Sequence, residues 1–436
     1  MVKEMVKNLM QTGVGFSKNT DSYKATTEAA EKALKELKGK APDLTLIFYA
    51  GNYNPKEINK VLMEKFKGTE FIGGSTDAVI YKDGMYPEGI VITSFYSNYL
   101  HFGVSSVDNI SKNPKKLASA TIEKAVQKIK LDTYIDSYMA FSRVKKGNVT
   151  ELIRTPSFFV FALTRGYQPT RMGNEDLIID GIGERIGHYI PVFGGSLGSD
   201  MDNVFKNIPY EIVTFHSGKI MKDGLVTAFA CTGLSYAGSI AHGAKPLNHL
   251  GYISKVTGGG FVVQEINETP IIDWYAKNIG VTKKEFTDKL LFYTQKYPLG
   301  FPDGYGNIVM RAGGVPHPEG LAYIAPFTRN TPIFVMNLED NKQLMQANKE
   351  LSSDLSKHVK IKEEPAFRFL VSCSSRRRVL DKKSYSKELK QLSGLHKAPL
   401  FGFCSFGEIG SKPAETCHFH HLCTNVFNIY NRLLSK

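Results

Sequence analysis

The chain has 436 residues, of which 42% are hydrophobic and 22% are charged. This composition is typical of a globular protein with a large core, and it excludes a mostly disordered, collagenous or coiled-coil chain. Lysine and arginine outnumber aspartate and glutamate by 55 to 42, which gives a net charge of +13. The basic residues are spread along the chain, with residues 376–378 as their densest run, so nucleic acid is not an expected partner.

Two further features of the sequence predict a cytoplasmic protein with no membrane partner. Lys3, Glu4 and Lys7 interrupt the N-terminal segment, unlike the apolar region of a signal peptide. The sequence has no apolar run of the roughly 18 residues that a membrane-spanning helix needs. The five cysteines are an odd and sparse set, which favours reduced thiols over a disulfide scaffold.

The first elements alternate between helix and strand. Apolar residues recur every three to four positions over residues 21–37, which predicts an amphipathic helix. An apolar run at 44–50 has strand character, and Pro55 stands at a plausible first position of the next helix. A second short strand is expected at 70–72. From residue 78 the hydrophobic period changes to two, which indicates antiparallel strands.

This unit recurs further along the chain. An apolar strand at 156–162, a helix at 176–187 and a short strand at 191–193 repeat the first order of elements. In both copies the last strand runs into a Gly-Gly-Ser motif, at residues 73–75 and at residues 194–196. We therefore predict an internal duplication.

A third, degenerate copy is expected near the C-terminus. It comprises an apolar strand at 366–372, a short helix at 384–393 and a strand that enters the glycine-containing segment 402–408. The predicted fold is α+β, with repeated strand–helix–strand units and antiparallel sheets. A glycine-rich region near residues 233–251 divides the chain into two parts, 11–235 and 250–432.

Several of these motifs occur, in the same order, in a known family. They include Ile72-Gly-Gly-Ser-Thr76, Ser372-Cys-Ser-Ser-Arg376, Gly402-Phe-Cys-Ser-Phe-Gly-Glu-Ile409 and His421-Leu-Cys-Thr424. The chain resembles a stand-alone FIST domain protein over about residues 11–430, and the two predicted parts resemble its N-terminal and C-terminal domains.

The resemblance implies a sensory module that binds a small ligand, proposed in the family to include amino acids. Such a module would report to a separate signalling partner, such as a histidine kinase. Some members resemble haem-binding nitric-oxide sensors, so a haem sensor is an alternative, although no cofactor is the first expectation. A thiol-dependent enzyme using Cys373 or Cys404, and an adaptor without a small ligand, are further alternatives.

The two Gly-Gly-Ser motifs are candidate ligand contacts. Glycine lets a ligand approach backbone N–H groups, and a serine hydroxyl can bond a carboxylate. Residues 194–198 fit Gly-x-Ser-x-Gly formally, but residues 199–203 begin a helix poorly, so no nucleophile is predicted. A sheet bend with a capping serine is the alternative.

Charged residues near the third glycine segment complete the predicted site. Arg376 or Arg311 could pair with a ligand carboxylate, while Glu408, beside Gly407, could pair with an ammonium. An internal Glu–Arg pair is the alternative for these residues. Cys373, next to a basic turn, is a further candidate.

Residues 417–423 contain two cysteines and three histidines, yet a usual zinc fold needs donors that the spacing does not supply. No metal site and no catalytic residue are therefore predicted. His421 matches a family histidine and could contact the ligand or haem iron. The predicted ligand-binding residues are Gly73, Gly74, Ser75, Gly194, Gly195, Ser196, Arg311, Cys373, Arg376, Gly407, Glu408 and His421.

Overall fold

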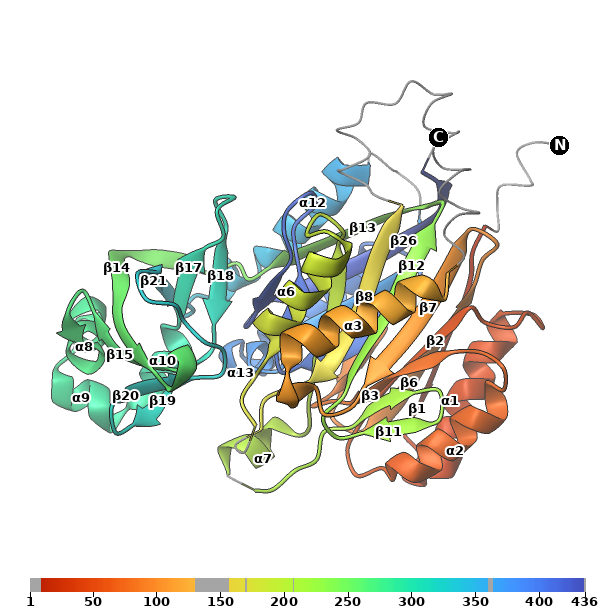
Figure 1. Ribbon diagram of the computed structural model, residues 1–436, viewed down its shortest axis with the longest axis horizontal. Helices are drawn as coiled ribbons and strands as arrows, with labels where there is room; N and C mark the ends of the chain where they lie inside the picture. The colour runs from red at the N-terminus through yellow and green to blue at the C-terminus, as the bar shows by residue number, and fades with distance from the viewer. Residues whose placement is uncertain (1–8, 130–156, 169–170, 207, 360–363, 435–436) are drawn as a thin grey trace.

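The structure, a computed structural model, describes residues 9–129, 157–168, 171–206, 208–359 and 364–434. It consists of a large body and a smaller lobe, which lies on the left in Figure 1. The body is built from three units that share one order of elements, and strands and helices are both well represented. The mixed helix-and-sheet fold and the two-part architecture predicted from the sequence are confirmed.

The first unit shows the common plan: strand, helix, strand, helix, strand, hairpin and a final strand. The second unit repeats it, with additional short helices. The elements of the first unit are β1 (Gln11–Ser17), α1 (Ser22–Glu36), β2 (Leu44–Ala50), α2 (Pro55–Lys65), β3 (Phe71–Ser75), β4 (Val79–Tyr81), β5 (Gly84–Tyr86) and β6 (Gly89–Tyr96). Those of the second are β7 (Leu100–Val107), the 3-10 helix η1 (Ile110–Lys112), α3 (Pro114–Gln127), β8 (Phe158–Arg165), α6 (Glu175–Ile186), β9 (Val192–Leu197), α7 (Met201–Phe205), β10 (Thr214–His216), β11 (Lys219–Met221) and β12 (Leu225–Thr232).

The third unit follows the same plan but is interrupted by the lobe after its first strand. This confirms the degenerate third copy. Its elements are β13 (Leu234–Ala241), α11 (Asn341–Leu344), α12 (Ala347–Val359), β22 (Pro365–Cys373), α13 (Arg376–Val379), α14 (Lys382–Gly394), β23 (Phe401–Ser405), β24 (Glu408–Gly410), β25 (His418–His420) and β26 (Thr424–Leu433).

Each of the three six-stranded sheets contains four strands from one unit and a two-stranded hairpin from another unit. The hairpin β10–β11 of the second unit joins the first sheet, β24–β25 of the third joins the second, and β4–β5 of the first joins the third. The three units are thus linked in a closed cycle. The sheet orders are β1-β6-β2-β3-β10-β11, β7-β12-β8-β9-β24-β25 and β13-β26-β22-β23-β4-β5.

A glycine at one equivalent position marks the central strand pair of each sheet. The pairs β2/β3, β8/β9 and β22/β23 are parallel, which a helical crossover permits. At Gly73, Gly194 and Gly402 a Cβ would overlap the carbonyl oxygen of the neighbouring strand. The predicted Gly-Gly-Ser turns are therefore strand residues. Their equivalent in the third unit is Gly402, not the segment at Gly407.

Aromatic side chains fill the space between the sheets. Phe48 stacks on Phe403 with ring centroids 4.3 Å apart, and Phe193 packs against Phe427 at 4.4 Å. These rings come from all three units, and Phe369 is buried among them. Because aromatic rings bury large apolar areas and prefer specific geometries, this core fixes the three sheets against one another.

The lobe, residues 245–337, is a curled sheet covered by short helices (Figure 1). Its sheet order is β18-β17-β21-β14-β15-β20-β19, and only Ala312 separates the two end strands along the chain. Trp274, Tyr275 and Phe286 pack into its own core. Its elements are β14 (Lys245–Thr257), the 3-10 helix η2 (Gly258–Gly260), β15 (Val262–Ile266), β16 (Thr269–Pro270), α8 (Ile271–Ile279), α9 (Lys283–Asp288), α10 (Leu290–Lys296), β17 (Leu299–Pro302), β18 (Ile308–Arg311), β19 (Gly313–His317), β20 (Gly320–Tyr323) and β21 (Pro332–Asn337).

The two structural parts do not coincide with the predicted segments 11–235 and 250–432. Residues 365–433 lie in the body, where they form most of the third sheet and supply a hairpin to the second. The physical reason is the exchange of hairpins, because each sheet combines strands that are far apart along the chain.

Replacement of Gly402 by alanine tests the parallel-strand packing. The new Cβ would overlap the carbonyl oxygen of Leu370, which belongs to a rigid neighbouring strand. We expect Gly402→Ala to lower the free energy of unfolding by about 1–3 kcal/mol. Gly394→Ala is the matched control, because a Cβ there meets no atom within 4 Å. Urea unfolding of both variants checks this, and equal stabilities would contradict it.

Candidate functional site

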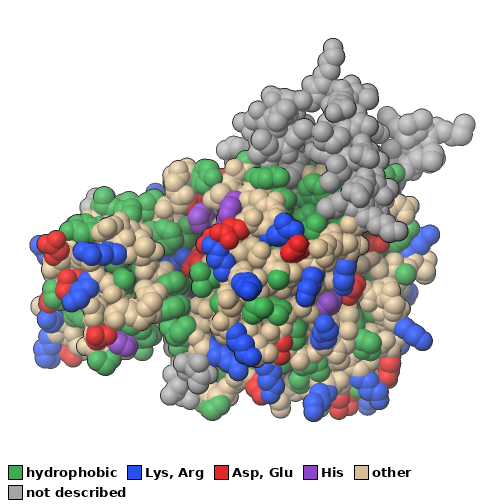
Figure 2. All heavy atoms as spheres, viewed as in Figure 1, with side chains coloured by type: hydrophobic (Ala, Val, Ile, Leu, Met, Phe, Trp, Pro, Cys, Tyr) green, Lys and Arg blue, Asp and Glu red, His purple; other side chains and the backbone are tan. Residues whose placement is uncertain are grey.

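A cavity of about 210 Å³ lies where the lobe meets the body. Its walls are the end of β13, the turn between β17 and β18, the helix α12 and the segment 411–420. Histidine and acidic side chains gather at this junction on the face shown in Figure 2. The cavity is smaller than the roughly 300–1,000 Å³ of pockets for drug-sized ligands, so its size suits a small metabolite.

An asparagine links the lobe wall to the body wall. The Asn307 side chain donates to Asp303 Oδ2 and to Glu415 Oε2, each at 2.9 Å. Asp303 also accepts from the backbone N–H groups of Tyr305 and Asn307, which fixes the turn between β17 and β18. Burial, reinforced by repulsion from Asp303, raises the pKa of Glu415. The carboxylates of Asp303 and Glu415 therefore lie close enough to repel each other, and both accept a hydrogen bond from the Asn307 amide.

Three histidines on the wall are held in the neutral state. Burial, with nearby Arg376 and Lys412, lowers the pKa of His242 to about 4, and its Nδ1 accepts from the N–H of Ala244 at 2.9 Å. Burial also lowers the pKa values of His418 and His420. At neutral pH these rings supply hydrogen-bonding atoms and no charge.

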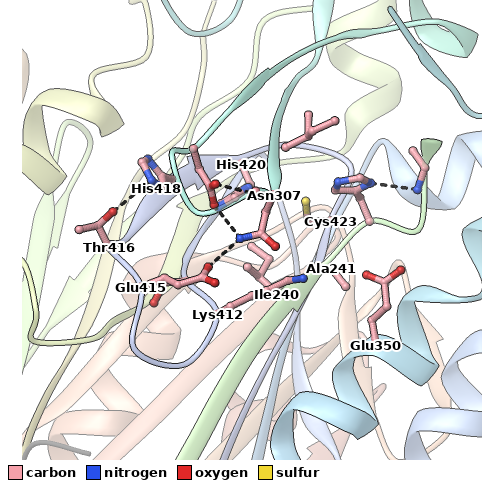
Figure 3. Close-up of a pocket in the computed structure, with 16 residues that line it drawn as sticks. Ile240, Ala241, Asn307, Glu350, Lys412, Glu415, Thr416, His418, His420 and Cys423 are labelled. Carbon is pink, nitrogen blue, oxygen red and sulfur yellow. Dashed lines mark hydrogen bonds between the residues drawn. The ribbon is translucent and has the colours of Figure 1, made fainter. Parts of the chain in front are cut away.

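Two unpaired charges of opposite sign reach the cavity from different walls (Figure 3). Lys412 comes from the segment after β24, and Glu350 comes from α12. Among the described residues, neither side chain forms a hydrogen bond or an ion pair. The charged ends of Lys412 and Glu350 are therefore available to a ligand. His420 Nδ1 is buried and has no partner in the described part of the chain.

The glycine and serine residues predicted for the site lie elsewhere, at the junction of the three units. Ser75 Oγ accepts from the N–H of Val213 at 2.9 Å, and Ser196 Oγ donates to Glu175 at 2.6 Å. A Cβ at Gly407 would overlap the Phe419 ring. The surroundings of these residues are thus filled by protein, and none of the twelve predicted residues lines the cavity.

Arg376 is a structural residue. It is 2% exposed, and its guanidinium bonds both carboxylate oxygens of Glu388. The remaining bonds go to the carbonyl oxygens of His242, Leu344 and Leu422. The internal Glu–Arg alternative is therefore the observed one for Arg376, with Glu388 as the partner. Since His242 lines the cavity, the bond from Arg376 to the His242 carbonyl helps to hold that wall in place.

Arg311 joins the lobe to the body. Its guanidinium donates two hydrogen bonds of 2.9 Å to Asp176 on α6 and one to the carbonyl of Phe419. The rings of Phe301 and Phe419 lie 5.0 and 5.8 Å from it. The buried Arg311 side chain is paired with the half-buried Asp176, so Arg311 is not free to bind a carboxylate.

Glu408, Cys373 and His421 are buried and do not line the cavity. Glu408 accepts from the hydroxyl of Ser405 and from the N–H of Cys423. Burial raises the pKa of Glu408 to about 8. Burial lowers the pKa of His421 to about 3, and both of its ring nitrogens lack partners within the described chain.

The cysteines do not have the environment of a nucleophile. Burial raises the pKa of Cys404 to about 12 and the pKa of Cys373 well above its ordinary value. The thiolate is the reactive form, so both thiols are held inert at neutral pH. Among the described residues no group of three or more His, Cys, Asp or Glu side chains is arranged to hold a metal ion.

Haem does not fit the observed site. A porphyrin is larger than the cavity of about 210 Å³. His421, the predicted iron ligand, is 1% exposed, and its ring packs against Phe419 at 4.7 Å between centroids.

The dense cluster at residues 417–423 was the sequence signal closest to the site, since His418, His420 and Cys423 line the cavity. The sequence reasoning missed Lys412, Glu350 and the Asn307 turn. Segment 411–418 contains one lysine and one glutamate, and no short-range pattern connects them to α12 or to the lobe.

Comparison with known families is decisive at this point. The FIST N domain matches residues 43–269, and the FIST C domain matches residues 272–411. The chain belongs to the FIST family. FIST domains are sensory and signal-transduction domains. A search of curated proteins found no match, and no helix in the described ranges is long and apolar enough to cross a membrane.

The boundary between the two FIST regions falls inside the lobe. It separates β16 from α8, which are consecutive elements of that part. Each FIST region therefore supplies some of the lobe, and both supply walls of the cavity. Residues 240–244 come from FIST N, whereas Asn307 and Glu350 come from FIST C.

Removal of Arg376 tests its structural role in the FIST fold. Arg376→Met would leave the buried carboxylate of Glu388 without a partner, which costs about 3–5 kcal/mol of stability. The double variant Arg376→Met/Glu388→Leu should recover much of this loss, because it removes both charges. Urea unfolding of the three proteins measures this, and a single variant as stable as the parent would contradict it.

The raised pKa of Glu408 predicts a pH dependence of stability. Its folded pKa of about 8 exceeds the unfolded value of about 4.3, so the folded state binds the extra proton. The contribution of Glu408 is present below the unfolded pKa and declines as pH rises through 8. Compared with Glu408→Gln, the parent should lose up to about 1 kcal/mol per pH unit between pH 5 and pH 8. Chemical unfolding across this range measures the difference, and parallel curves would contradict the assignment.

Proposed function

We propose that this FIST protein is a cytoplasmic sensory module that binds an amino acid or similar small zwitterion between the lobe and the body. Occupancy would be reported to a separate signalling protein, such as a histidine kinase. On this proposal the protein acts by binding rather than by catalysis, and without a cofactor.

The observation that carries the proposal is that two side chains of opposite charge, Lys412 and Glu350, line the cavity and have no partner among the described residues. An amino acid has an ammonium and a carboxylate a few ångströms apart, and Lys412 and Glu350 reach the cavity from different walls (Figure 3). Charge-assisted hydrogen bonds in a partly enclosed site are stronger than neutral ones. A zwitterion could satisfy both walls at once.

The position of the cavity suggests how binding would be transmitted. Its walls come from both structural parts, and the lobe wall is attached to the body wall through Asn307 and Glu415. A ligand that bonds both walls stabilises the lobe-docked arrangement by its differential affinity. The nearby contact of Arg311 with Asp176 would carry a change in docking to α6.

The alternatives have less support. A thiol enzyme requires an accessible thiolate, which the burial of Cys373 and Cys404 opposes. A haem sensor requires a larger pocket. A Soret band after addition of haemin, lost in His421→Ala, would favour the haem alternative over the present proposal.

A calorimetric titration with amino acids tests the proposal. We expect binding to the parent protein and a loss of at least about tenfold in affinity for Lys412→Met and for Glu350→Gln, which corresponds to about 1.4 kcal/mol each. Lys382→Met is the matched control, since Lys382 is exposed at the start of α14, away from the cavity. Failure of every amino acid to bind would favour an adaptor, and parental affinity in Lys412→Met would exclude the assigned role of that residue.

A further inference from the structure

Resting on the proposed function, we infer that the ligand carries a net positive charge, as a basic amino acid does, with a second ammonium held by the acids of the lobe turn and segment 411–418. The cavity wall has more carboxylates than are needed to bind the single ammonium of a zwitterion. Three carboxylates line the cavity, those of Asp303, Glu350 and Glu415, against a single ammonium, that of Lys412.

Among the residues that the structure describes, no other charge lining the cavity offsets this excess. The three histidines of the wall are neutral at pH 7, for the reasons given above. The nearby guanidinium of Arg376 is neutralised by Glu388, and that of Arg311 by Asp176. The cavity is therefore anionic when empty of ligand cations.

The acids are also crowded in a way that a cation would relieve. The Asn307 amide is the hydrogen-bond donor shared by Asp303 and Glu415. Asp354, one turn along α12 from Glu350, adds to the repulsion at Glu415. An ammonium between these groups would supply three N–H donors and a compensating charge.

A second and independent feature indicates a donor-rich ligand. The His420 side chain lines the cavity, the residue is 7% exposed, and its Nδ1 has no hydrogen-bond partner in the described part of the chain. A neutral imidazole has one lone pair that accepts a hydrogen bond. Buried polar atoms are seldom left unpaired, and in the tautomer with its proton on Nε2 the acceptor Nδ1 would be complemented by an ammonium N–H.

On this inference, each of the three charged groups of the ligand binds to different residues of the cavity. Lys412 would take the carboxylate and Glu350 the α-ammonium. Asp303 and Glu415, with His420, would take the distal ammonium. A ligand with a neutral side chain of the same length would not relieve the repulsion between Asp303 and Glu415. A ligand with an acidic side chain would increase that repulsion.

Isothermal titration of the full chain with L-lysine, L-norleucine and L-glutamate tests the inference. L-norleucine has the length of L-lysine without its distal ammonium. We expect L-lysine to bind at least about tenfold more tightly than L-norleucine and L-glutamate to bind more weakly still. Asp303→Asn should reduce the preference for L-lysine over L-norleucine to less than threefold. Glu319→Gln, at an exposed turn of the lobe outside the cavity wall, should retain it.

The outcomes separate this inference from the proposed function. Binding of L-norleucine or L-glutamate as tight as that of L-lysine would overturn the inference and leave the amino-acid sensor in place. Absence of binding by all three, with a folded protein by circular dichroism, would overturn both. An unchanged preference in folded Asp303→Asn would remove the lobe turn from the distal contact.

Discussion

The exchange of β-hairpins among the three units is the constraint on which the rest of the structure depends. In each sheet the third residue of the glycine segment donates its N–H to a carbonyl just before the incoming hairpin: Ser75 to Val213, Ser196 to Gly407 and Cys404 to Ala78. Each incoming hairpin covers an edge that would otherwise expose unpaired backbone groups. Because the exchange is cyclic, no unit can complete its own sheet, and the body forms as a whole.

The lobe breaks this three-unit symmetry at one place. It is inserted after β13 of the third unit, opposite the segment that connects β24 to β25 of the exchanged hairpin. The cavity forms between these two additions and α12. Asp303, Asn307, Lys412 and Glu415 come from the two additions, whereas Glu350 comes from α12, which is an element of the repeat. The Gly-Gly-Ser motifs, which the repeat does conserve in position, serve the sheets instead.

Two buried arginines near this cavity form ion pairs within the protein, whereas Lys412 and Glu350 on its wall form none among the described residues. The buried guanidinium groups of Arg376 and Arg311 pair with the buried Glu388 and the half-buried Asp176, and they donate to backbone carbonyls of the surrounding segments. Breaking either pair would leave a buried charge, which is strongly unfavourable. Within the described residues the side chains of Lys412 and Glu350 lack such partners, and this difference is the reason for proposing that they contact a ligand.

The sequence by itself determined the class of fold, the repeat and the family, because hydrophobic periodicity and glycine spacing are local properties of each strand and helix. It also contains the cysteine and histidine cluster at residues 417–423, three of which line the cavity, although His421, the residue predicted there to contact a ligand, does not. It did not show that Arg376, Glu408 and the Gly-Gly-Ser residues are enclosed by protein, because a residue type does not reveal whether its side chain is buried among partners or exposed. Only the tertiary structure decided that. Asp176 and the exchanged hairpins lie far along the chain from the residues that they contact, and even Glu388, which is 12 residues from Arg376, becomes a buried partner only when the third unit folds.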